Sequence, residues 1–454
     1  MKIIIIGAGE VGFHIASRLA LENKDVVVVD KDDKSIQRVA DQLDVQTITG
    51  SGSSPVILEE AGIKNAEILL AVTNSDETNL VACLVANIIS PNTKKLARLR
   101  DAGYDGYHQT FRDKPPHIDT IINPEIEVVK SIERLLGVPG AVDVGEFEGG
   151  RIKFVGIILD EGARLAGAKL SEFPQILGKD RPLVTAIIRN EALIIPTGND
   201  RLMPNDLVYF ISHNDKLMDA LKMFDKYDES LNRVLIVGGG RIGLRLASLL
   251  ENKSIHTKII ESDEKRCVAL AEQLNKAVVL CGDGSDHEIL REENIQDMDV
   301  VVTVTDNEET NILASLLCKR MGAKKAITKI SRFSYFHLLS TIGVNLIVSP
   351  RLSAINTILQ HIRRGKILSA ITIKGEQAEV IEAVALETSD IVGKPLKRLS
   401  FPKGALLAAI IRKDKIIIPS GESVVDPGDK IIIFANRNVV PKIEKILMVK
   451  LEFF

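Results

Sequence analysis

The chain has 454 residues, a length typical of roughly three domains at about 150 residues each. Its 45% hydrophobic and 26% charged residues are ordinary for a globular protein and exclude general disorder. A formal net charge of −3 and only 4% aromatic residues, with no tryptophan, argue against nucleic acid as a partner. No apolar stretch approaches the roughly 18 residues that span a bilayer, so we expect a soluble protein.

The cysteines and the N-terminus indicate a cellular location. Cys83, Cys267, Cys281 and Cys318 are scattered, without CxxC pairs or the spacing of a disulfide framework. The N-terminal apolar run meets a glycine at position 7, too soon for the apolar core of a signal peptide. Together these features predict a protein of the reducing cytoplasm.

The first predicted elements are a strand at residues 2–6, a glycine loop at 7–12, and a helix that begins in the loop. Val11, Ile15 and Leu19 recur at the spacing of one helical face, which indicates the helix. Further short apolar runs, separated by helix-length amphipathic stretches, lie at 26–29, 47–48, 68–72 and 96–99. This alternation is typical of βαβ units on a parallel sheet.

A different pattern follows this first lobe. Pro124 predicts the first position of a helix that leads out of the lobe to about Leu136, and Pro350 predicts the same in the second half of the chain, to about Arg363. Beyond the first of these helices, strand-like alternations at 153–158 and 183–188 are separated by Gly, Pro and Asp turns. They favour a small α+β lobe with antiparallel pairing. A charged segment at 222–232 marks the boundary with the second half.

The second half of the chain repeats the first. The block IIIIGAGEVG at 3–12 matches VLIVGGGRIG at 234–243, which lies 231 residues later. The block AIIRNEALIIPTG at 186–198 matches AIIRKDKIIIPSG at 409–421, which lies 223 residues later. Because separate blocks recur in the same order, the sequence predicts an A-B-A′-B′ tandem repeat.

The repeat defines an α/β fold class with two Rossmann-like parallel-sheet lobes, each followed by a small α+β C-lobe. The predicted domains are nucleotide-binding N-lobe 1, C-lobe 1, nucleotide-binding N-lobe 2 and C-lobe 2. Their predicted bounds are 1–136, 137–225, 230–363 and 364–454.

The glycine loop of lobe 1 has the features of a dinucleotide-binding turn. Gly7 permits the tight turn, Gly9 lets the backbone approach a pyrophosphate, and Gly12 allows the helix to pack closely on the strand. The backbone N–H groups at the helix start would hold the phosphates. Asp30, 18 residues after Gly12, would accept hydrogen bonds from the ribose hydroxyls and repel a 2′-phosphate.

We therefore predict one cofactor site in each N-lobe and no catalytic or metal site. In lobe 1 its residues are Gly7, Ala8, Gly9, Glu10, Val11, Gly12, Asp30, Thr73, Asn74 and Arg98. In lobe 2 they are Gly238, Gly239, Gly240, Arg241, Ile242, Gly243, Glu261, Thr305 and Lys329. The alternatives are lobes that keep their glycines only for packing, and acids that merely lie exposed at a strand end.

Thr73, Asn74 and Thr305 follow the fourth predicted strand of their lobes, where ligands bind in parallel sheets. A second interpretation, N-capping of the next helix, is compatible with the first. Arg98 and Lys329 end the fifth predicted strand. Each would meet phosphate or a neighbouring subunit, unless it is an ordinary surface cation.

The basic run that contains Arg98 extends from Lys94 to Arg100. We expect it to form a solvated rim rather than a nucleic-acid patch.

The chain carries no sign of catalysis. It has no Walker lysine, HExxH motif, CxxC pair or nucleophile elbow, and no histidine is matched by a histidine in the other copy. A dehydrogenase would need an acid–base group beside the nicotinamide, and the C-lobes offer no cluster that could supply one. Two nucleotide lobes without chemistry indicate a sensor.

At this point the sequence resembles the TrkA family of potassium-uptake regulators, which are built from two tandem RCK units. The blocks that carry the resemblance are GAGEVG with Asp30, GSGSSPVILEEAGI and AVTNSDETNL, together with their copies GGGRIG with Glu261, CGDGSDHEILREENI and TVTDNEETNI. Ser51 departs from the pattern, since the copy has Asp283 there. The segment 104–117, rich in aromatic residues and proline, has no assigned role.

The resemblance implies a regulatory subunit, not an enzyme, that binds NAD(H), or ATP and ADP. It implies a peripheral protein on the cytoplasmic face of the membrane that gates a TrkH-type potassium transporter or channel. It also implies a homotetramer whose units form an eight-unit ring. An NAD-dependent oxidoreductase and a regulator of another membrane transporter are the alternatives.

Overall fold

The computed structural model describes residues 1–178, 181–227, 231–332, 335–362, 367–373, 377–413 and 415–447. The chain divides into two compact units, Met1–Glu127 with Pro350–Ile362 and Val128–Ser349 with Arg363–Phe454. The predicted domain limits at 230, 363, 364 and 454 lie outside the described residues. In the described part of the chain, no helix is long and apolar enough to cross a membrane.

Lobe 1 is a parallel sheet in the order β3-β2-β1-β4-β5-β6, the arrangement typical of dinucleotide-binding folds. Its strands are β1 (Lys2–Ile6), β2 (Asp25–Asp30), β3 (Gln46–Thr49), β4 (Ile68–Ala71), β5 (Lys94–Arg98) and β6 (Thr120–Ile122). Its helices are α1 (Glu10–Leu21), α2 (Asp33–Gln42), α3 (Pro55–Glu60), α4 (Asp76–Ile89) and α5 (His108–Asp113). The central strands are Ile- and Val-rich because helices cover both of their faces.

Lobe 2 repeats this sheet in the order β14-β13-β12-β15-β16-β17. Its strands are β12 (Arg233–Val237), β13 (His256–Glu261), β14 (Val278–Cys281), β15 (Val300–Thr303), β16 (Lys325–Lys329) and β17 (Leu346–Val348). Its helices are α9 (Arg241–Asn252), α10 (Glu264–Gln273), α11 (His287–Glu292), α12 (Glu308–Arg320) and α13 (Phe336–Thr341). The predicted strands and glycine-loop helices of both lobes are thereby confirmed.

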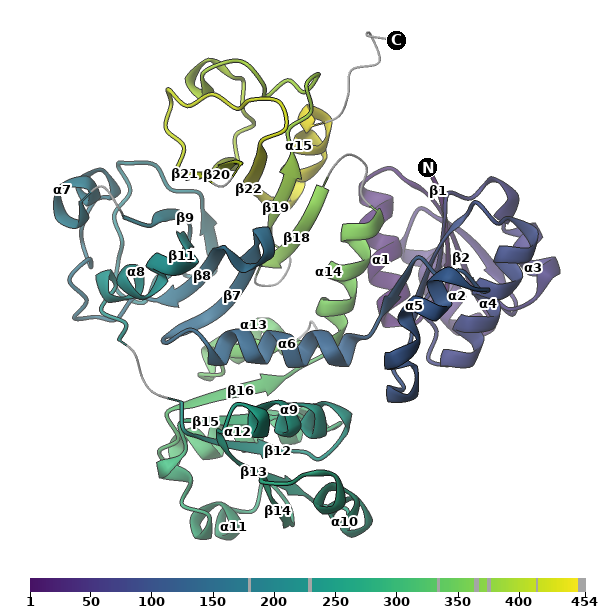
Figure 1. Ribbon diagram of the computed structural model, residues 1–454, viewed down its shortest axis with the longest axis horizontal. Coiled ribbons are helices and arrows are strands. Elements are labelled where there is room, and N and C mark those ends of the chain that lie inside the picture. The colour runs from purple at the N-terminus through teal and green to yellow at the C-terminus, as the bar shows by residue number, and fades with distance from the viewer. Residues whose placement is uncertain are drawn as a thin grey trace. The chain divides into compact units, whose positions relative to one another are not determined.

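The helix that leaves each N-lobe packs on the other N-lobe. Helix α6 (Pro124–Leu136) follows lobe 1, yet Val128, Val129 and Ile132 lie in the hydrophobic core of lobe 2. Helix α14 (Pro350–Ile362) follows lobe 2 but packs beside α1 and β6 of lobe 1 (Figure 1). The sequence predicted both helices and gave no indication of this exchange.

Each C-lobe is a five-stranded antiparallel sheet with one main helix, as predicted. C-lobe 1 contains β7 (Ala141–Phe147), β8 (Ile152–Ile158), β9 (Leu183–Arg189), β10 (Ala192–Ile194), β11 (Leu207–His213), α7 (Phe173–Leu177) and α8 (Leu217–Met223). C-lobe 2 contains β18 (Ile367–Ile373), β19 (Ala378–Val384), β20 (Ala405–Arg412), β21 (Lys415–Ile417), β22 (Lys430–Asn436) and α15 (Val440–Leu447).

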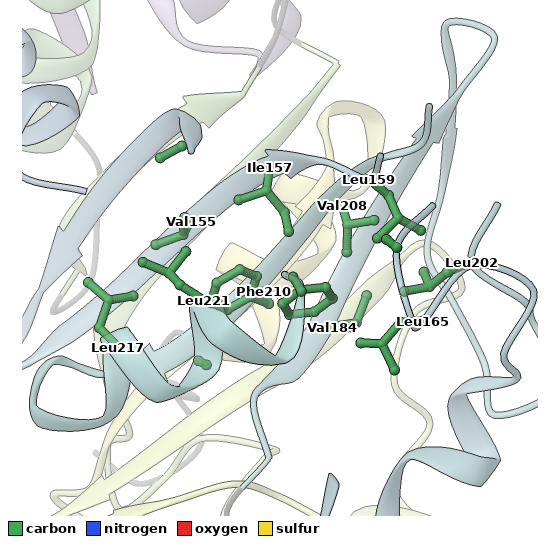
Figure 2. Packing of buried hydrophobic residues seen from close by; sticks show 14 of the residues in the cluster. Val155, Ile157, Leu159, Leu165, Val184, Leu202, Val208, Phe210, Leu217 and Leu221 are labelled. Carbon is green, nitrogen blue, oxygen red and sulfur yellow. The ribbon is translucent and has the colours of Figure 1, made fainter. Parts of the chain in front are cut away.

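The two faces of each C-lobe sheet bury different cores. In C-lobe 1, one face packs on α8 around Phe210 and Leu221 (Figure 2). The other face meets C-lobe 2 in a shared core, where the rings of Phe154 and Phe434 stack with centroids 6.3 Å apart. The two C-lobes therefore form one continuous sheet-on-sheet packing.

Candidate functional site

The glycine loop of lobe 1 has the geometry that its three glycines predict. Gly7 has φ +112°, and a Cβ there would lie 3.0 Å from the backbone nitrogen of Thr73. A Cβ at Gly12 would lie 1.8 Å from the carbonyl oxygen of Gly7, so only glycine lets α1 approach β1 this closely. Among the described residues, no heavy atom lies within 4 Å of a Cβ built at Gly9.

Lobe 2 reproduces each of these features. Gly238 has φ +110°, and a Cβ at Gly243 would lie 1.9 Å from the carbonyl oxygen of Gly238. Gly240 corresponds to Gly9, and its Cβ position is likewise clear of the described residues. In both lobes the first turn of a helix opens at this point, so backbone N–H groups and the positive end of the helix dipole face the loop.

The other loop residues predicted for the site fall into two groups. Val11 and Ile242 turn their side chains into the lobe cores, so only their backbone is available to a ligand. Glu10 and Arg241 occupy the first position of their helices and are exposed. The loop therefore offers mainly backbone groups, as phosphate binding requires.

The acids at the ends of β2 and β13 bind the glycine loops directly. Asp30 accepts a hydrogen bond from the backbone nitrogen of Ala8 at 2.6 Å and from that of Asp32 at 3.0 Å. Glu261 accepts from Gly239 at 2.8 Å and from Asp263 at 2.9 Å. The two carboxylates thus hold equivalent backbone groups.

Glu261 is held in its charged form. Burial raises its pKa, but hydrogen bonds from the backbone of Asp263 and Gly239, and the charge of Arg266, lower the pKa below the ordinary value. Each Asp30 oxygen accepts one backbone hydrogen bond and retains a lone pair that a ribose hydroxyl could use. In Glu261, Oε1 also accepts from Ser262 Oγ at 3.3 Å and Oε2 from Arg266 Nη1 at 3.4 Å, so a ribose hydroxyl there would have to replace one of these partners.

Thr73 and Thr305 do not cap the following helices. The side chains that cap α4 and α12 are Ser75, which accepts from Thr78 N, and Asn307. Thr73 Oγ1 instead donates to Asn79 Oδ1 at 2.8 Å. The capping interpretation is therefore wrong for the threonines.

Asn79 and its counterpart Asn311 are fully buried residues that sequence reasoning missed. Asn79 Nδ2 donates to the carbonyl oxygen of Arg98 at 2.8 Å, and Asn311 Nδ2 donates to that of Lys329 at 3.1 Å. Each asparagine ties the end of the fourth strand to the end of the fifth. The sequence signal that could have identified these two residues is the repeat of the blocks AVTNSDETN and TVTDNEETN, which end at Asn79 and Asn311.

Arg98 lies at the carboxyl edge of the lobe 1 sheet, with Asn74 beside it. Its Nη1 lies 3.4 Å from Asn74 Oδ1, and its buried Nε has no hydrogen-bond partner among the described residues. Burial, followed by the nearby charge of Arg100, lowers the pKa of Arg98 to about 10. An anion at this edge would restore a partner for the guanidinium.

Lys329 is placed differently in lobe 2. It is buried, and its Nζ lies 3.3 Å from the carboxylate of Asp306. Asn74 occupies the position of Asp306 in lobe 1, so the cation of lobe 2 has a carboxylate within ion-pair distance at the position where lobe 1 has a neutral amide.

The prediction that the basic run from Lys94 to Arg100 forms a solvated rim is wrong for Lys95. Lys95 is only 2% exposed and donates its ammonium protons to the carbonyl oxygens of Pro91 and Thr93. Burial lowers its pKa. Lys95 lies inside β5, between β4 and β6 in a sheet that helices cover on both faces, which explains why this lysine is buried.

Two arginines that sequence reasoning missed hold Glu10. Arg38 Nη1 lies 2.6 Å from one carboxylate oxygen, and Arg351 Nη1 lies 3.0 Å from the other. Burial opposes ionisation of Glu10, but hydrogen bonding to Arg38 and the charge of Arg351 lower its pKa. Because Arg351 belongs to α14, the second half of the chain contributes a residue beside the lobe 1 glycine loop. No local sequence pattern predicts this contact.

The repeated C-lobe blocks contain a structural ion pair. Arg189 Nε donates to the buried Asp206 at 2.8 Å, and Arg412 Nη2 donates to the buried Asp429 at 2.7 Å. Both aspartates also accept from a backbone nitrogen three residues earlier. The arginine of each repeated block thus holds an equivalent turn in the two C-lobes.

The unassigned segment 104–117 forms part of lobe 1. It contains α5, and Tyr104 and Phe111 pack against the lobe 1 core with ring centroids 6.1 Å apart. In the described ranges, no group of three or more His, Cys, Asp or Glu side chains is placed to hold a metal ion.

Two glycine-loop lobes, each followed by an antiparallel lobe, define the fold class of this protein as that of tandem RCK domains. The solved "GsuK RCK domain" has the same fold, with a TM-score of 0.61 and 18% identity over 98% of this chain and 94% of that one. The structure described as "GsuK channel bound to NAD" has a TM-score of 0.60 and 18% identity over 98% of this chain and 78% of that one.

Family comparison gives the particular assignment. The TrkA-N domain matches residues 3–124 and 234–350, and the TrkA-C domain matches 154–225 and 380–448. The chain is 39% identical to "Trk system potassium uptake protein TrkA homolog 2" of Methanosarcina mazei, over 98% of this chain and all of the relative. The chain therefore belongs to the TrkA family of potassium-uptake proteins, and it is a regulatory protein rather than an enzyme, as predicted.

Proposed function

We propose that nucleotide binding in the two N-lobes regulates potassium transport by a TrkH-type membrane protein. The observation that carries this proposal is the paired glycine loop and acid, present with the same hydrogen bonds in both lobes. NAD(H) is the ligand that this geometry favours, since the acid matches a ribose and the helix start matches a pyrophosphate. The NAD-bound channel of the same fold supports the choice.

We further propose that the two sites differ in preference. Lobe 1 accepts ATP and ADP as well as NAD(H), because Arg98 has an unpartnered donor and faces the neutral Asn74. Lobe 2 is biased toward NAD(H), because Asp306 already neutralises Lys329, and because Asp283 adds negative charge where lobe 1 has Ser51. Like charge near a polyphosphate is unfavourable.

The assembly we propose follows from the family. Four chains would form a ring of eight RCK units on the cytoplasmic face of the membrane, bound to the potassium transporter. The ring would change shape if nucleotide bound one shape more tightly than another.

Single substitutions in each loop test the binding sites in the full chain. Gly9→Asp and Gly240→Asp should preserve the fold, because both positions have negative φ and clear Cβ positions. Each places a carboxylate where we expect phosphate. Calorimetric titration with NADH should show two sites per chain in the wild type and one in each variant. Gly9→Asn is the matched neutral control, and it should weaken binding less than Gly9→Asp does.

Unchanged stoichiometry in both aspartate variants would contradict the proposed sites. For the site preference, ATP and NADH are titrated into the two variants in parallel. Equal preference ratios would contradict the proposed difference between the lobes.

A further inference from the structure

Two of the four cysteines meet beside the acid of lobe 2. Cys267 is the fourth residue of α10, and Cys281 is the last residue of β14. Helix α10 packs on β14, and in the parallel pairing of β13 with β14, Cys281 stands opposite Glu261. Both cysteines are free thiols.

The Cys267 thiol and the backbone that follows Cys281 meet at one carbonyl oxygen. The carbonyl oxygen of Glu261 accepts from Gly282 N at 2.8 Å, immediately after Cys281, and from the thiol of Cys267 at 3.2 Å. Cys281 is the register partner of Glu261 across the β13–β14 pairing, so Cys267 and Cys281 are both neighbours of this one residue. The pair therefore flanks the backbone of the acid that we assign to ribose.

The two thiols differ in accessibility. Cys281 is exposed, whereas Cys267 is 8% exposed. Burial, hydrogen bonding to Cys281 and its charge raise the pKa of Cys267 to about 12. Because Cys281 is the exposed thiol, a dissolved oxidant reaches it first, and the buried Cys267 beside it is placed to resolve the oxidised sulfur.

The rest of the chain provides internal controls. In lobe 1, Ile36 and Thr49 occupy the positions of Cys267 and Cys281, and Thr49 stands opposite Asp30 in the same register. Cys83 and Cys318 are fully buried in the lobe cores, remote in sequence from this pair. Only lobe 2 thus carries adjacent thiols beside its acid.

From this arrangement we propose that Cys267 and Cys281 are a redox modification site, which peroxide converts to a disulfide next to Glu261. Disulfides in a reducing compartment are typically transient and redox-sensing, which fits a pair with one exposed thiol.

The chemistry balances with hydrogen peroxide as the oxidant. The Cys281 thiolate attacks one peroxide oxygen, so that an S–O bond forms, the O–O bond breaks, and water leaves after protonation. The sulfur of Cys267 then attacks the sulfur of Cys281, so that the S–S bond forms, the S–O bond breaks, and the released hydroxide takes the Cys267 proton as a second water. A small dithiol reverses the reaction.

The bond changes the surroundings of Glu261. It removes the hydrogen bond that the Cys267 thiol donates to the Glu261 carbonyl oxygen, and it joins α10 covalently to the end of β14. Where lobe 2 binds NADH as proposed above, its affinity should fall at least threefold on oxidation, while lobe 1 should not respond.

The experiment uses the full-length chain, reduced, freed of reductant and then treated with a small excess of peroxide. Free thiols are alkylated, and the digest is analysed by mass spectrometry. We expect a linked pair of peptides that contain Cys267 and Cys281, two hydrogens lighter than the free peptides, and we expect Cys83 and Cys318 to be alkylated only after unfolding. A small dithiol should abolish the link.

The matched variants are Cys267→Ile and Cys281→Thr, which install the residues of lobe 1. Neither should form an internal link, and because lobe 1 tolerates both residues, both should fold. NADH titration of the oxidised Gly9→Asp chain reports lobe 2, and that of the oxidised Gly240→Asp chain reports lobe 1.

Several results would overturn the proposal. They are the absence of a 267–281 link, a link through Cys83 or Cys318, or Cys281 joined only to Cys281 of another chain. A linked chain with unchanged NADH affinity in lobe 2 would overturn the coupling to the acid. A reduced chain that binds no NADH at all would contradict the proposed function and leave the disulfide result standing by itself.

Discussion

The residue pairs Ala8–Asp30 and Gly239–Glu261 make the same backbone-to-carboxylate hydrogen bond with different side chains. Glu261 is one methylene longer than Asp30, yet both carboxylates hold the same loop amide. Lobe 2 has glycine where lobe 1 has alanine, and a Cβ at Gly239 would lie 2.3 Å from Leu270 Cδ1 and 3.1 Å from Glu261 Oε2, so glycine makes room for both side chains. The sequence showed both differences, but only their contact shows that they compensate for one another.

Asp30 supports the first prediction. In a chain whose second site is silenced by Gly240→Asp, Asp30→Ala should weaken NADH binding by ~1.5–3 kcal/mol, the size of hydrogen bonds to a charged partner. Calorimetry measures the change. Asp30→Asn is the control, since its amide oxygen can still accept from Ala8 N. It should lose less affinity, and both variants should discriminate less against NADPH. Unchanged affinity in Asp30→Ala would show that the acid is not a ligand.

Asp143, on β7, supports a prediction about pH. Burial raises its pKa to about 6, although hydrogen bonds from Tyr209 and from Val144 N oppose the shift. The ordinary value in an unfolded chain is about 3.9. The folded state therefore favours the neutral acid, so this contribution to stability is complete below about pH 4 and is lost as the pH rises through about 6.

Asp143→Asn keeps the shape of the side chain and removes the titration. At pH 8 it should stabilise the C-lobes by about 1–2 kcal/mol, and at pH 4 it should have no such effect. Scanning calorimetry at the two pH values checks the difference. A variant whose melting temperature relative to wild type is the same at both pH values would contradict the assignment.

At the scale of elements, the exchanged helices are the main feature that the sequence could not predict. The prolines at 124 and 350 indicated the starts of α6 and α14, but this local signal does not say on which lobe a helix packs. Charge distinguishes them: Arg351 of α14 binds Glu10, whereas the equivalent residue of α6, after the same helix-starting proline, is Glu125. If α6 packed on lobe 1 in place of α14, the carboxylates of Glu125 and Glu10 would lie close together.

This charge pattern makes the docking of α14 testable. Arg351→Glu should destabilise the docked helix by ~1–2 kcal/mol, whereas Arg351→Ala should cost no more than about 1 kcal/mol, as expected of a partly exposed pair. Hydrogen exchange of residues 350–362 reports the docking. The double variant Glu10→Gln with Arg351→Glu removes the repulsion and should recover part of the loss. Equal exchange in all variants would mean that the pair does not select the helix.

At the scale of the whole molecule, prediction from the sequence was most successful where a motif is local. The α/β class and the glycine loops were readable because they depend on short spacings such as that from Gly7 to Gly12, and the tandem repeat was readable because separate blocks recur in the same order. The buried Asn79 and Asn311, the arginines around Glu10 and the shared C-lobe core were not. These depend on residues brought together by the sheet order and by the helix exchange.

The central claim is that nucleotide occupancy of the two glycine loops sets the activity of a potassium-transporting membrane protein. The most direct measurement is rubidium flux through a TrkH-type protein in vesicles, with the full-length chain added to the cytoplasmic face. We predict that NADH or ATP changes the flux severalfold with the wild-type chain and leaves it unchanged with the Gly9→Asp/Gly240→Asp double variant. A rubidium flux that does not change when the chain is added, or a nucleotide response that persists with the double variant, would contradict the account.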